Sequence, residues 1–384
     1  MLFTLVFRNM LRHKLRSALT MLGVAIAVAA FVFLRTVVAM WYVSAEASNA
    51  NRIVSRNNIS ITFPLPLAFK ERIASVEGVT ALTFANWFGG IYKNPSEFFA
   101  QFAVDPDTYF SVYPEYRVSE SEMAAFKSDR AGCIVGKKLA ERYGWKMGDV
   151  IRLTGTIYDG DWDFTIRAIY TGEKANTDET QFFFNWKYLD EQVAVQSKTQ
   201  SGYVGFYIAL LDSPDKATQV CAAIDGLFAN SSAETLTETE SAFQLSFIQM
   251  SEAIIGSLQA VSLVIIVIML LVLANTMSMS ARERLRDYAT LKSLGFKSGF
   301  IYALIIGEAA LISAVGALLG VVIATPLTQG FGAAVAQFFP VFEVEPLLVV
   351  GAAVVAVVAG AIAGLFPARA ASNTPITDGL RYIG

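Results

Sequence analysis

Four long apolar stretches constrain this chain more than any other feature of its sequence. They cover residues 17–43, 253–280, 300–327 and 347–366, and a polar block, residues 44–252, separates the first from the second. A bilayer core about 30 Å thick takes about 20 helical residues to cross, and only helices satisfy their own backbone hydrogen bonds in lipid. The sequence therefore predicts an α-helical membrane protein with four transmembrane helices and one large water-exposed domain.

Composition supports this class of protein and argues against several others. Apolar residues make up 54% of the chain and charged residues 16%, against about 25% charged residues in an ordinary soluble domain. The formal net charge of −3 gives no sign of a nucleic-acid partner. The only histidine is His13, which excludes a histidine-based catalytic triad and a multi-histidine zinc site. We therefore expect no catalytic residue, no metal site and no nucleic acid.

The first apolar stretch also has features of a secretory signal peptide. Four basic residues precede it, and Ala45-Glu46-Ala47 follows it in the manner of a cleavage site. However, the apolar run is longer than the usual core of a signal peptide, and three further apolar stretches follow. We therefore predict an uncleaved membrane anchor.

The distribution of Lys and Arg predicts the orientation of the chain in the membrane. Residues 1–16 carry four Lys/Arg and no acid, the loop at 281–299 carries five, and the loop at 328–346 carries none. Because Lys and Arg are retained on the cytoplasmic side, both termini, including the tail at 367–384, and the 281–299 loop are expected there. Residues 44–252 and 328–346 then lie in the periplasm, outside a bacterial inner membrane.

The polar block is predicted to fold as an α+β domain of its own. It holds 18 Lys/Arg and 27 Asp/Glu. At its ends, residues 41–57 and 238–252 have helix-compatible patterns, so we expect two stalk helices that continue the first and second spans. Strands are predicted at residues 58–63, 78–88, 98–104, 132–135, 150–156, 163–170, 181–185 and 204–210. Helices are predicted at residues 67–76, 137–143 and 214–228.

The polar block shows no catalytic constellation and one weak candidate for a metal site. Asp159, Asp161 and Asp163 alternate as the ligands of a calcium loop do. A loop that starts at Asp159 places Phe164 where the EF-hand needs glycine and Tyr170 where it needs glutamate. We therefore predict the solvated tip of a hairpin rather than a calcium site.

Both cysteines, Cys133 and Cys221, lie in the polar block and have no metal-binding spacing. A disulfide is allowed outside the cytoplasm. Cys133 follows a glycine in a predicted strand, and Cys221 lies in a predicted apolar helix. Two separately buried thiols are therefore favoured over a bond between them.

The loop after the second span carries the most informative pattern. Leu285, Tyr288, Leu291 and Leu294 recur at helical spacing with charged residues on the other face, and Gly295 suits a helix C-cap. This pattern predicts a short amphipathic helix on the cytoplasmic side. Its charges taken alone also fit a loop that only sets membrane topology.

The order of residues in this loop resembles the signature of the FtsX-like, or MacB-type, ABC transporter permeases. That signature has Arg-x-Arg, an acidic-hydrophobic pair, a basic-small-Leu-Gly tail and a span that opens with Glu-Ala. Here these are Arg282 and Arg284, Asp287-Tyr288, Lys292 to Gly295, and Glu308-Ala309. The resemblance continues at residues 8–17, 136–153, 163–172, 366–371 and 375–381.

The resemblance implies a permease subunit whose outer domain has a porter part near the membrane and an inserted β-rich part. The loop helix would be the coupling helix that docks on an ABC ATPase, and a second copy of this chain or a related permease would complete the transporter. The residues that the resemblance assigns to ATPase coupling are Arg282, Glu283, Arg284, Leu285, Arg286, Asp287, Tyr288, Leu291, Lys292, Leu294 and Gly295.

MacB itself carries its ATPase fused at the N-terminus, and this sequence differs from it there. The nearest candidate for a phosphate-binding loop, residues 131–138, has alanine where the first glycine should stand. It also has Lys138 where Ser or Thr should follow the lysine. We therefore expect ATP and Mg²⁺ on a separate ATPase chain and no cofactor on this one.

Two ionisable residues lie within the predicted spans. Glu308 in the third span is compatible with a proton relay or with a structural role, in which its carboxylate reaches the membrane interface or pairs with an arginine of the coupling loop, and we favour the structural role. Arg35 lies near the outer end of the first span. Its side chain is predicted to reach the membrane interface rather than to contact a lipid or a substrate.

Small residues and one proline predict how the spans pack. Gly316 with Gly320, and Gly360 with Gly364, form two GxxxG pairs of the kind that bring helices into close contact. Pro326 is expected to end or kink the third span.

The resemblance implies ATP-driven export, or efflux, by mechanotransmission. In this picture the ATPase moves the coupling helices, the first two spans carry the motion to the outer domain, and the substrate need not pass between the spans. A periplasmic adaptor and an outer-membrane channel would be further partners. Release of lipoproteins from the membrane, and signalling to a periplasmic cell-wall hydrolase without transport, are alternatives. The large outer domain favours export and lipoprotein release over signalling.

Overall fold

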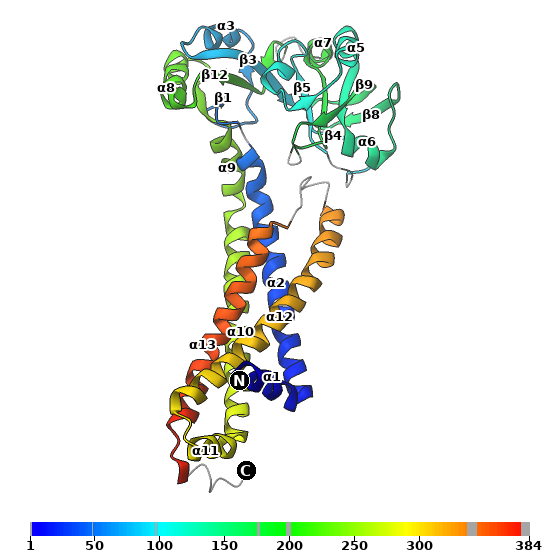
Figure 1. Cartoon of the computed structure of the whole chain (residues 1–384). Coiled ribbons are helices and arrows are strands. Elements are labelled where there is room, and N and C mark those ends of the chain that lie inside the picture. Colours follow the sequence, from blue (N-terminus) through cyan, green and yellow to red (C-terminus); the bar gives the residue numbers. More distant parts are fainter. Residues whose placement is uncertain are drawn as a thin grey trace. The chain divides into compact units, whose positions relative to one another are not determined.

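A computed structural model describes residues 2–47, 49–95, 97, 99–174, 177–196, 201–335 and 344–377 of the chain. It divides into two compact units (Figure 1). The membrane unit comprises residues 1–40, 251–334 and 342–384, and the outer unit comprises residues 41–250 and 335–341. Parts of four predicted segments lie outside the described residues, namely Ser48, Phe98, residues 336–343 and residues 378–384.

Long apolar helices build the membrane unit. The helices long and apolar enough to cross a membrane are α2 (Lys14–Ala47), α10 (Glu252–Glu283), α12 (Ser298–Val335) and α13 (Pro346–Asn373). Within the residues that the structure describes, they confirm the prediction of four such helices. Two short helices, α1 (Leu2–Arg12) and α11 (Leu285–Ser293), complete the unit. The sequence reasoning missed α1, although Val6 and Met10 are buried one helical turn apart while Arg8 and Arg12 are exposed.

The first GxxxG pair, Gly316 with Gly320, packs α12 against α2. A Cβ atom added to Gly316 would lie 2.7 Å from the Cβ of Val24, and one added to Gly320 would lie 2.6 Å from the carbonyl oxygen of Ala25. Both distances are shorter than a nonbonded contact allows. Glycine at these two positions is therefore what lets the two backbones approach.

The second pair, Gly360 with Gly364, packs α13 against α12. The space beside Gly360 is filled by the Ser313 side chain, and a Cβ on Gly364 would lie 3.1 Å from the Cβ of Ala309. The two predicted pairs thus lie at two different helix contacts, and both contacts involve α12.

Two of the spans continue through a proline, beyond the ends that the sequence predicted. Pro326 does not end α12, which continues to Val335, and α13 passes through Pro367 to Asn373. Beyond Pro326 the hydroxyl of Thr328 lies 2.8 Å from the carbonyl oxygen of Ala324. One missing backbone bond is cheaper in an apolar medium than unwinding a helix, because unwinding would leave several polar groups unpaired.

The outer unit begins and ends with a ferredoxin-like part. It contains β1 (Arg52–Asn57), α3 (Phe69–Ala74), β3 (Val79–Trp87), β12 (Phe206–Leu211), α8 (Ala217–Phe228) and β13 (Thr235–Thr239). A short 3₁₀ turn at Pro214–Lys216 precedes α8. The sheet order is β13-β1-β12-β3 with each neighbouring pair antiparallel, which is the order that two β-α-β units produce. A separate small sheet pairs β2 (Leu65–Pro66) with β11 (Tyr203–Val204).

Residues 88–205, here called the inserted part, lie between β3 and β12 in the chain. Its strands are β4 (Gly90–Ile91), β5 (Gln101–Val104), β6 (Tyr116–Arg117), β7 (Gly132–Gly136), β8 (Val150–Gly155), β9 (Gly160–Gly172) and β10 (Phe182–Asn185). Its helices are α4 (Tyr109–Val112), α5 (Glu120–Ser128), α6 (Lys137–Tyr143) and α7 (Trp186–Gln196). The inserted part is β-rich, as predicted, and forms its own lobe of the outer unit in Figure 1.

One sheet runs through both parts of the outer unit. Strand β3 of the ferredoxin-like part pairs with β5 of the inserted part through Ala85↔Val104, Asn86↔Ala103 and Trp87↔Phe102. We call this short ladder the seam. Aromatic residues dominate the apolar cores on the two faces of the sheet near the seam. Phe182, Phe183 and Phe184 of β10 are all fully buried. The outer unit is therefore an α+β domain, in agreement with the prediction.

The predicted stalks and the first predicted strand needed correction. Helix α2 ends at Ala47 and residues 52–57 form β1, so the helix expected over 41–57 stops early. Residues 58–63 alternate in polarity but form no strand, because Ile59 is 82% exposed and faces no core. The helix expected over 238–252 is α9 (Glu240–Met250), which is separated from α10 by Ser251.

Helices α5 and α7 and strand β13 were not predicted from the sequence. A local signal for α5 was present, because Ser119 accepts a hydrogen bond from the backbone N–H of Glu122 and the two residues form a capping box. Strand β13 is short and polar, and it is held by its neighbour β1. A polar strand of this kind has no periodicity that would distinguish it from a loop.

Candidate functional site

The predicted coupling helix is α11, and a single residue separates it from α10. Helix α10 ends at Glu283, Arg284 has φ −104° and ψ 11°, and α11 starts at Leu285. The chain therefore turns from a long apolar helix into a short charged one at Arg284. In Figure 1, α11 lies beside the C-terminal end of α13.

Arg284 forms a buried ion pair inside the membrane unit. Its Nη1 donates to Oε2 of Glu308 at 2.8 Å, and its Nη2 donates to the carbonyl oxygen of Asn9 at 2.8 Å. Both charged side chains are 5% exposed. Of the two structural roles considered for Glu308, the structure shows the pairing with an arginine of the loop after α10. The pair links α12, the α10–α11 turn and α1.

Other contacts fix the buried side of α11. Nζ of Lys292 donates to the carbonyl oxygens of Ser372 and Thr374 at 2.7 Å each, at the end of α13. Tyr288 is buried, and burial together with the negative charge of Glu308 raises the pKa of its hydroxyl, which therefore stays protonated at neutral pH. Leu285 and Leu291 are half-buried in the same apolar cluster.

The end of α11 has the C-cap that the sequence predicted. Gly295 has a φ of +93°, its N–H donates to the carbonyl of Lys292, and the N–H of Phe296 donates to the carbonyl of Leu291. These two bonds form a Schellman motif, in which the left-handed residue is usually glycine. The motif directs the chain into α12 within a few residues.

The opposite side of α11 and of its junction with α10 faces solvent. Arg282, Glu283, Arg286, Asp287 and Leu294 are exposed, and the exposed fraction of Leu294 is 71%. The sequence placed Leu294 on the apolar face with Leu285, and this was wrong. Leu294 lies at the helix C-cap, where the chain already departs from the helical spacing. It is instead an apolar contact point on an otherwise charged surface.

Two exposed acidic residues of this region tie it to the N-terminal helices. Asp287 accepts a hydrogen bond from Arg12 at 2.6 Å, and Glu283 accepts two from Arg16 at 2.6 and 2.7 Å. Exposed ion pairs add little stability each. Their effect here is to orient both carboxylates, which leaves Arg282 and Arg286 as the exposed positive charges of the surface.

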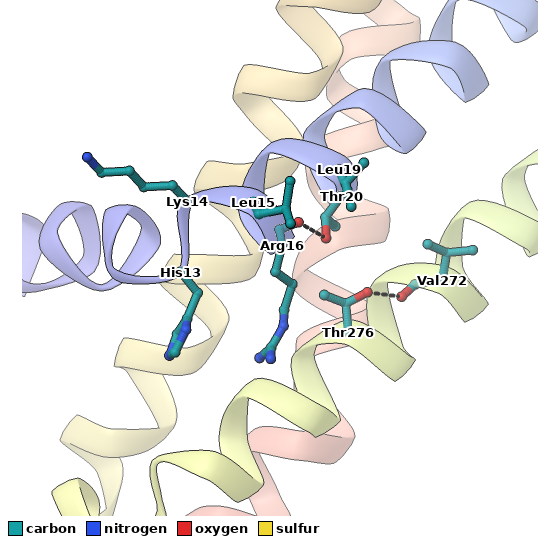
Figure 2. A pocket seen from close by; sticks show the side chains of 8 residues that line it. All are labelled: His13, Lys14, Leu15, Arg16, Leu19, Thr20, Val272 and Thr276. Atoms are coloured by element: carbon teal, nitrogen blue, oxygen red, sulfur yellow. Dashed lines mark hydrogen bonds between the residues drawn. The ribbon is translucent and has the colours of Figure 1, made fainter.

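A pocket of about 630 Å³ lies between α2 and α10 near the same ion pairs (Figure 2). Its lining residues are His13, Lys14, Leu15, Arg16, Leu19, Thr20, Val272 and Thr276. Figure 2 shows the Lys14 side chain directed away from Thr276 and Arg16. Because Glu283 already neutralises Arg16, the pocket presents no concentrated positive charge to a ligand.

The other residues that the sequence singled out are packed within a helix or paired with residues of a neighbouring strand. Arg35 is half-buried in α2. Asp161 and Asp163 lie on β9 of the predicted hairpin, where they bind Thr154 and Arg152 of β8 at 2.9 and 2.7 Å. These cross-strand partners explain the alternation of the aspartates without a metal.

Cys133 and Cys221 are both free thiols, as predicted. Cys133 is fully buried in β7, and Cys221 is half-buried in α8. Burial raises the pKa of the Cys133 thiol well above its usual value and raises the pKa of Cys221 to about 11. Both therefore stay protonated and are poor nucleophiles at neutral pH.

Comparison with known proteins agrees with the resemblance. Residues 17–227 match the MacB-like periplasmic core domain, and residues 260–376 match the FtsX-like permease C-terminal domain. An uncharacterised ABC transporter permease of Methanocaldococcus jannaschii is 22% identical over 404 residues, covering 99% of this chain and 97% of the relative. The uncharacterised ABC transporter permease YvrN of Bacillus subtilis is 36% identical over 111 residues, or 28% of this chain and 26% of the relative.

Solved structures of outer domains are also similar in part. The extracellular domain of the ABC-type transporter YknZ from Gram-positive bacteria has a TM-score of 0.36 at 12% identity, covering 49% of this chain and 99% of that domain. The periplasmic region of MacB from Actinobacillus actinomycetemcomitans has a TM-score of 0.35 at 8% identity, covering 52% of this chain and 92% of that region. The family matches cover both the outer unit and the last three spans, so the chain belongs to the FtsX-like, MacB-type family of ABC transporter permeases.

Proposed function

We propose that this permease transmits the work of a separate ABC ATPase to its outer unit and thereby drives export of a substrate across the cell envelope. The ATPase, which binds ATP and Mg²⁺, docks on the exposed side of α11 from the cytoplasm. The outer unit then lies in the periplasm of a bacterial inner membrane, with both termini of the chain cytoplasmic. A second copy of this chain or a related permease completes the transporter.

The attachment of α11 carries this proposal. Its buried side is bound to three other helices through Arg284 and Lys292, while its other side presents Arg286 and Leu294 to solvent. A helix that merely joins two spans needs no such buried ion pair, and a buried pair carries a large desolvation cost. A helix that receives a force needs rigid attachment on one side and a free docking face on the other.

The connections of the outer unit support transmission. Helix α2 is continuous to Ala47 and leads within five residues into β1, and β13 leads directly into α9. A displacement of α2 or α9 therefore reaches two adjacent strands of one sheet, the interior strand β1 and the edge strand β13. The substrate itself need not pass between the spans in this mechanism.

Two other functions remain within the family resemblance, namely release of lipoproteins from the membrane and signalling to a periplasmic cell-wall hydrolase. The size of the outer unit favours export or lipoprotein release, because a signalling role needs only a compact domain. An adaptor and an outer-membrane channel among the partners would indicate export. A second, different permease would indicate lipoprotein release.

The test is affinity purification of the full chain from gently solubilised native membranes with a non-hydrolysable ATP analogue. The double variant Arg286→Glu with Leu294→Asp changes only exposed residues of α11, so the fold should be retained. Lys297→Glu is the matched control, because Lys297 is also exposed but lies after the Gly295 cap. We expect a stoichiometric ABC ATPase with the parent and the control, and its loss with the double variant.

Two results would contradict this proposal. The first is a parent preparation that contains no ATPase, although the membranes express one. In that case α11 would only set the topology of the chain in the membrane. Equal retention of the ATPase by the double variant would place the docking surface elsewhere on the chain.

A further inference from the structure

A buried arginine at the start of β1 joins three segments of the outer unit that are far apart in the sequence. Arg52, the first residue of β1, has a side chain that is 3% exposed. Its Nη1 and Nη2 donate to the carboxylate of Glu115 at 3.0 and 2.6 Å, and its Nε donates to Oε2 of Glu240 at 2.7 Å. Glu115 belongs to the inserted part, and Glu240 is the first residue of α9.

The surroundings of Arg52 satisfy nearly every polar group. Its Nη1 also donates to the carbonyl oxygen of Val112 at 3.2 Å, and its guanidinium lies 4.2 Å from the ring centre of Tyr113. Glu240 accepts two further hydrogen bonds, from the Tyr113 hydroxyl at 2.9 Å and from the backbone N–H of Asn49 at 3.0 Å. A buried ionic network is favourable only when its members are satisfied in this way.

The position of the network matters because the seam is narrow. The backbone ladders between the two parts are short, with three residue pairs between β3 and β5 and two between β2 and β11, and apolar residues of both parts pack together on both faces of the sheet. Backbone pairing of this width can act as a hinge. Arg52 attaches the inserted part to β1, which lies two strands away from β3 in the sheet. An attachment that far from the hinge line opposes rotation about the seam.

A second tie lies on the other face of the sheet. Ile53 packs in the cluster that contains residues of α3 and α8, whereas Val54 packs with residues of α4 and α9, so Arg52 lies on the face of Val54. On the α3 side, Nζ of Lys70 binds Oδ2 of Asp105, just after β5, at 2.8 Å. The tie through Arg52 differs from it in also holding α9 and the end of the segment that follows α2.

We propose that Arg52 is a positioning residue that locks the inserted part to the two segments through which α2 and α9 join the outer unit. The proposal rests on the mechanotransmission proposed above. With the Arg52 network intact, displacement of either segment moves the ferredoxin-like part and the inserted part together. Without it, the inserted part pivots about the seam and the displacement is not passed on.

The experiment measures the distance between the two parts in the purified full chain, reconstituted in nanodiscs. Spin labels are attached at Gln219→Cys in α8 and Val195→Cys in α7, both exposed, with Cys221 replaced by serine. Pulsed electron–electron double resonance then gives the distribution of distances between the two spin labels. We expect one narrow distribution for the parent, and a broader one with a displaced component for Arg52→Gln.

The matched control is Arg56→Gln. Arg56 lies four residues after Arg52 on β1. Its Nε binds Oε1 of Glu238 on β13 at 3.1 Å, so its ion pair stays within the ferredoxin-like part. The distribution should stay narrow for this variant. Because Arg52→Gln leaves the buried carboxylate of Glu240 and the partly exposed one of Glu115 without their partner and can unfold the unit, Glu115→Gln is the second test variant. Its side chain is 24% exposed, and it removes the tie to the inserted part while leaving the Arg52–Glu240 bond.

A narrow, unshifted distribution for both Arg52→Gln and Glu115→Gln would overturn the proposal, as would equal broadening in Arg56→Gln. Thermal unfolding of each variant shows whether broadening occurs in a folded protein. The distance measurement needs no ATPase, so it is independent of the purification experiment above. Missing ATPase with broadening in Arg52→Gln would refute the proposed function and leave the lock in place.

Discussion

At the scale of the residue, a few buried charges organise this protein. Arg284 with Glu308 in the membrane unit, and Arg52 with Glu115 and Glu240 in the outer unit, each join segments that are distant in the chain. Burial of a charge is costly, and the cost is offset only when each partner is held in good geometry. Such residues therefore have large and specific effects when one partner is removed.

Removal of one partner of the Arg284–Glu308 pair should destabilise the membrane unit strongly. Glu308→Gln and Arg284→Gln each leave a buried charge without its partner, which costs about 3–5 kcal/mol. The double variant Arg284→Met with Glu308→Leu removes both charges and should recover part of this loss. Thermal unfolding in detergent, with Arg282→Gln as the exposed control, measures the effect. Losses that simply add in the double variant would contradict a direct pair.

Asp105 should make the stability of the outer unit depend on pH. Burial alone would raise the pKa of Asp105, but the ammonium of Lys70 and the N–H of Asp107 lower it below its usual value. A carboxylate with a depressed folded pKa stabilises the fold above its unfolded pKa, and that contribution is lost as the pH falls through the folded pKa.

We therefore expect the parent to lose stability below about pH 4, and Asp105→Asn to lose less over the same range. Tryptophan fluorescence during chemical unfolding of the full chain, at pH values from about 5 to about 3, measures this dependence. Glu191→Gln, at an exposed ion pair, is the control. An equal slope in the parent and in Asp105→Asn would show that the Lys70 pair does not contribute.

At the scale of the element, small residues determine how closely the spans α2, α12 and α13 pack. Helix α12 contacts α2 through Gly316 and Gly320, and contacts α13 at Gly360 and Gly364. Lipid tails are as apolar as leucine, so close backbone approach and dispersion take the place of a hydrophobic driving force between the helices. Each of these contacts has little room for an added methyl group.

Gly320→Ala should therefore push α12 away from α2. The added Cβ would lie 2.6 Å from the carbonyl oxygen of Ala25, a backbone atom that cannot move aside cheaply. Overpacking of this kind costs about 1–3 kcal/mol. Gly330→Ala in the same helix is the matched control, because nothing lies within 4 Å of its added Cβ. Thermal unfolding in detergent should show a loss for the first variant alone, and equal behaviour of both would contradict close packing at Gly320.

At the scale of the whole molecule, the chain combines short connections between its helices and the sheet, from α2 to β1 and from β13 to α9, with a long insertion in the sheet. The ferredoxin-like part is formed from both ends of the outer unit, and residues 88–205 are inserted between its second and third strands. Strands from both parts nevertheless form one sheet. The outer unit therefore has a single continuous framework with a narrow seam, and side chains such as Arg52 and Lys70 cross that seam.

The sequence alone determined the features that depend on composition and short-range spacing. The four apolar helices, the amphipathic α11 with its Gly295 cap, and the short helix α6 were all predicted, because each is encoded within a few helical turns. The α5 capping box was encoded just as locally but was missed. Sequence order also supported the family resemblance.

Only the tertiary structure decided which side chains meet. It buried Arg284 at the start of α11, exposed Leu294, ended the first stalk at Ala47 and turned residues 52–57 into an interior strand of the sheet. Arg52 and Glu240 are 188 positions apart, and no local pattern links them. Such contacts depend on strand pairing and burial, which are properties of the folded chain and not of any short segment of it.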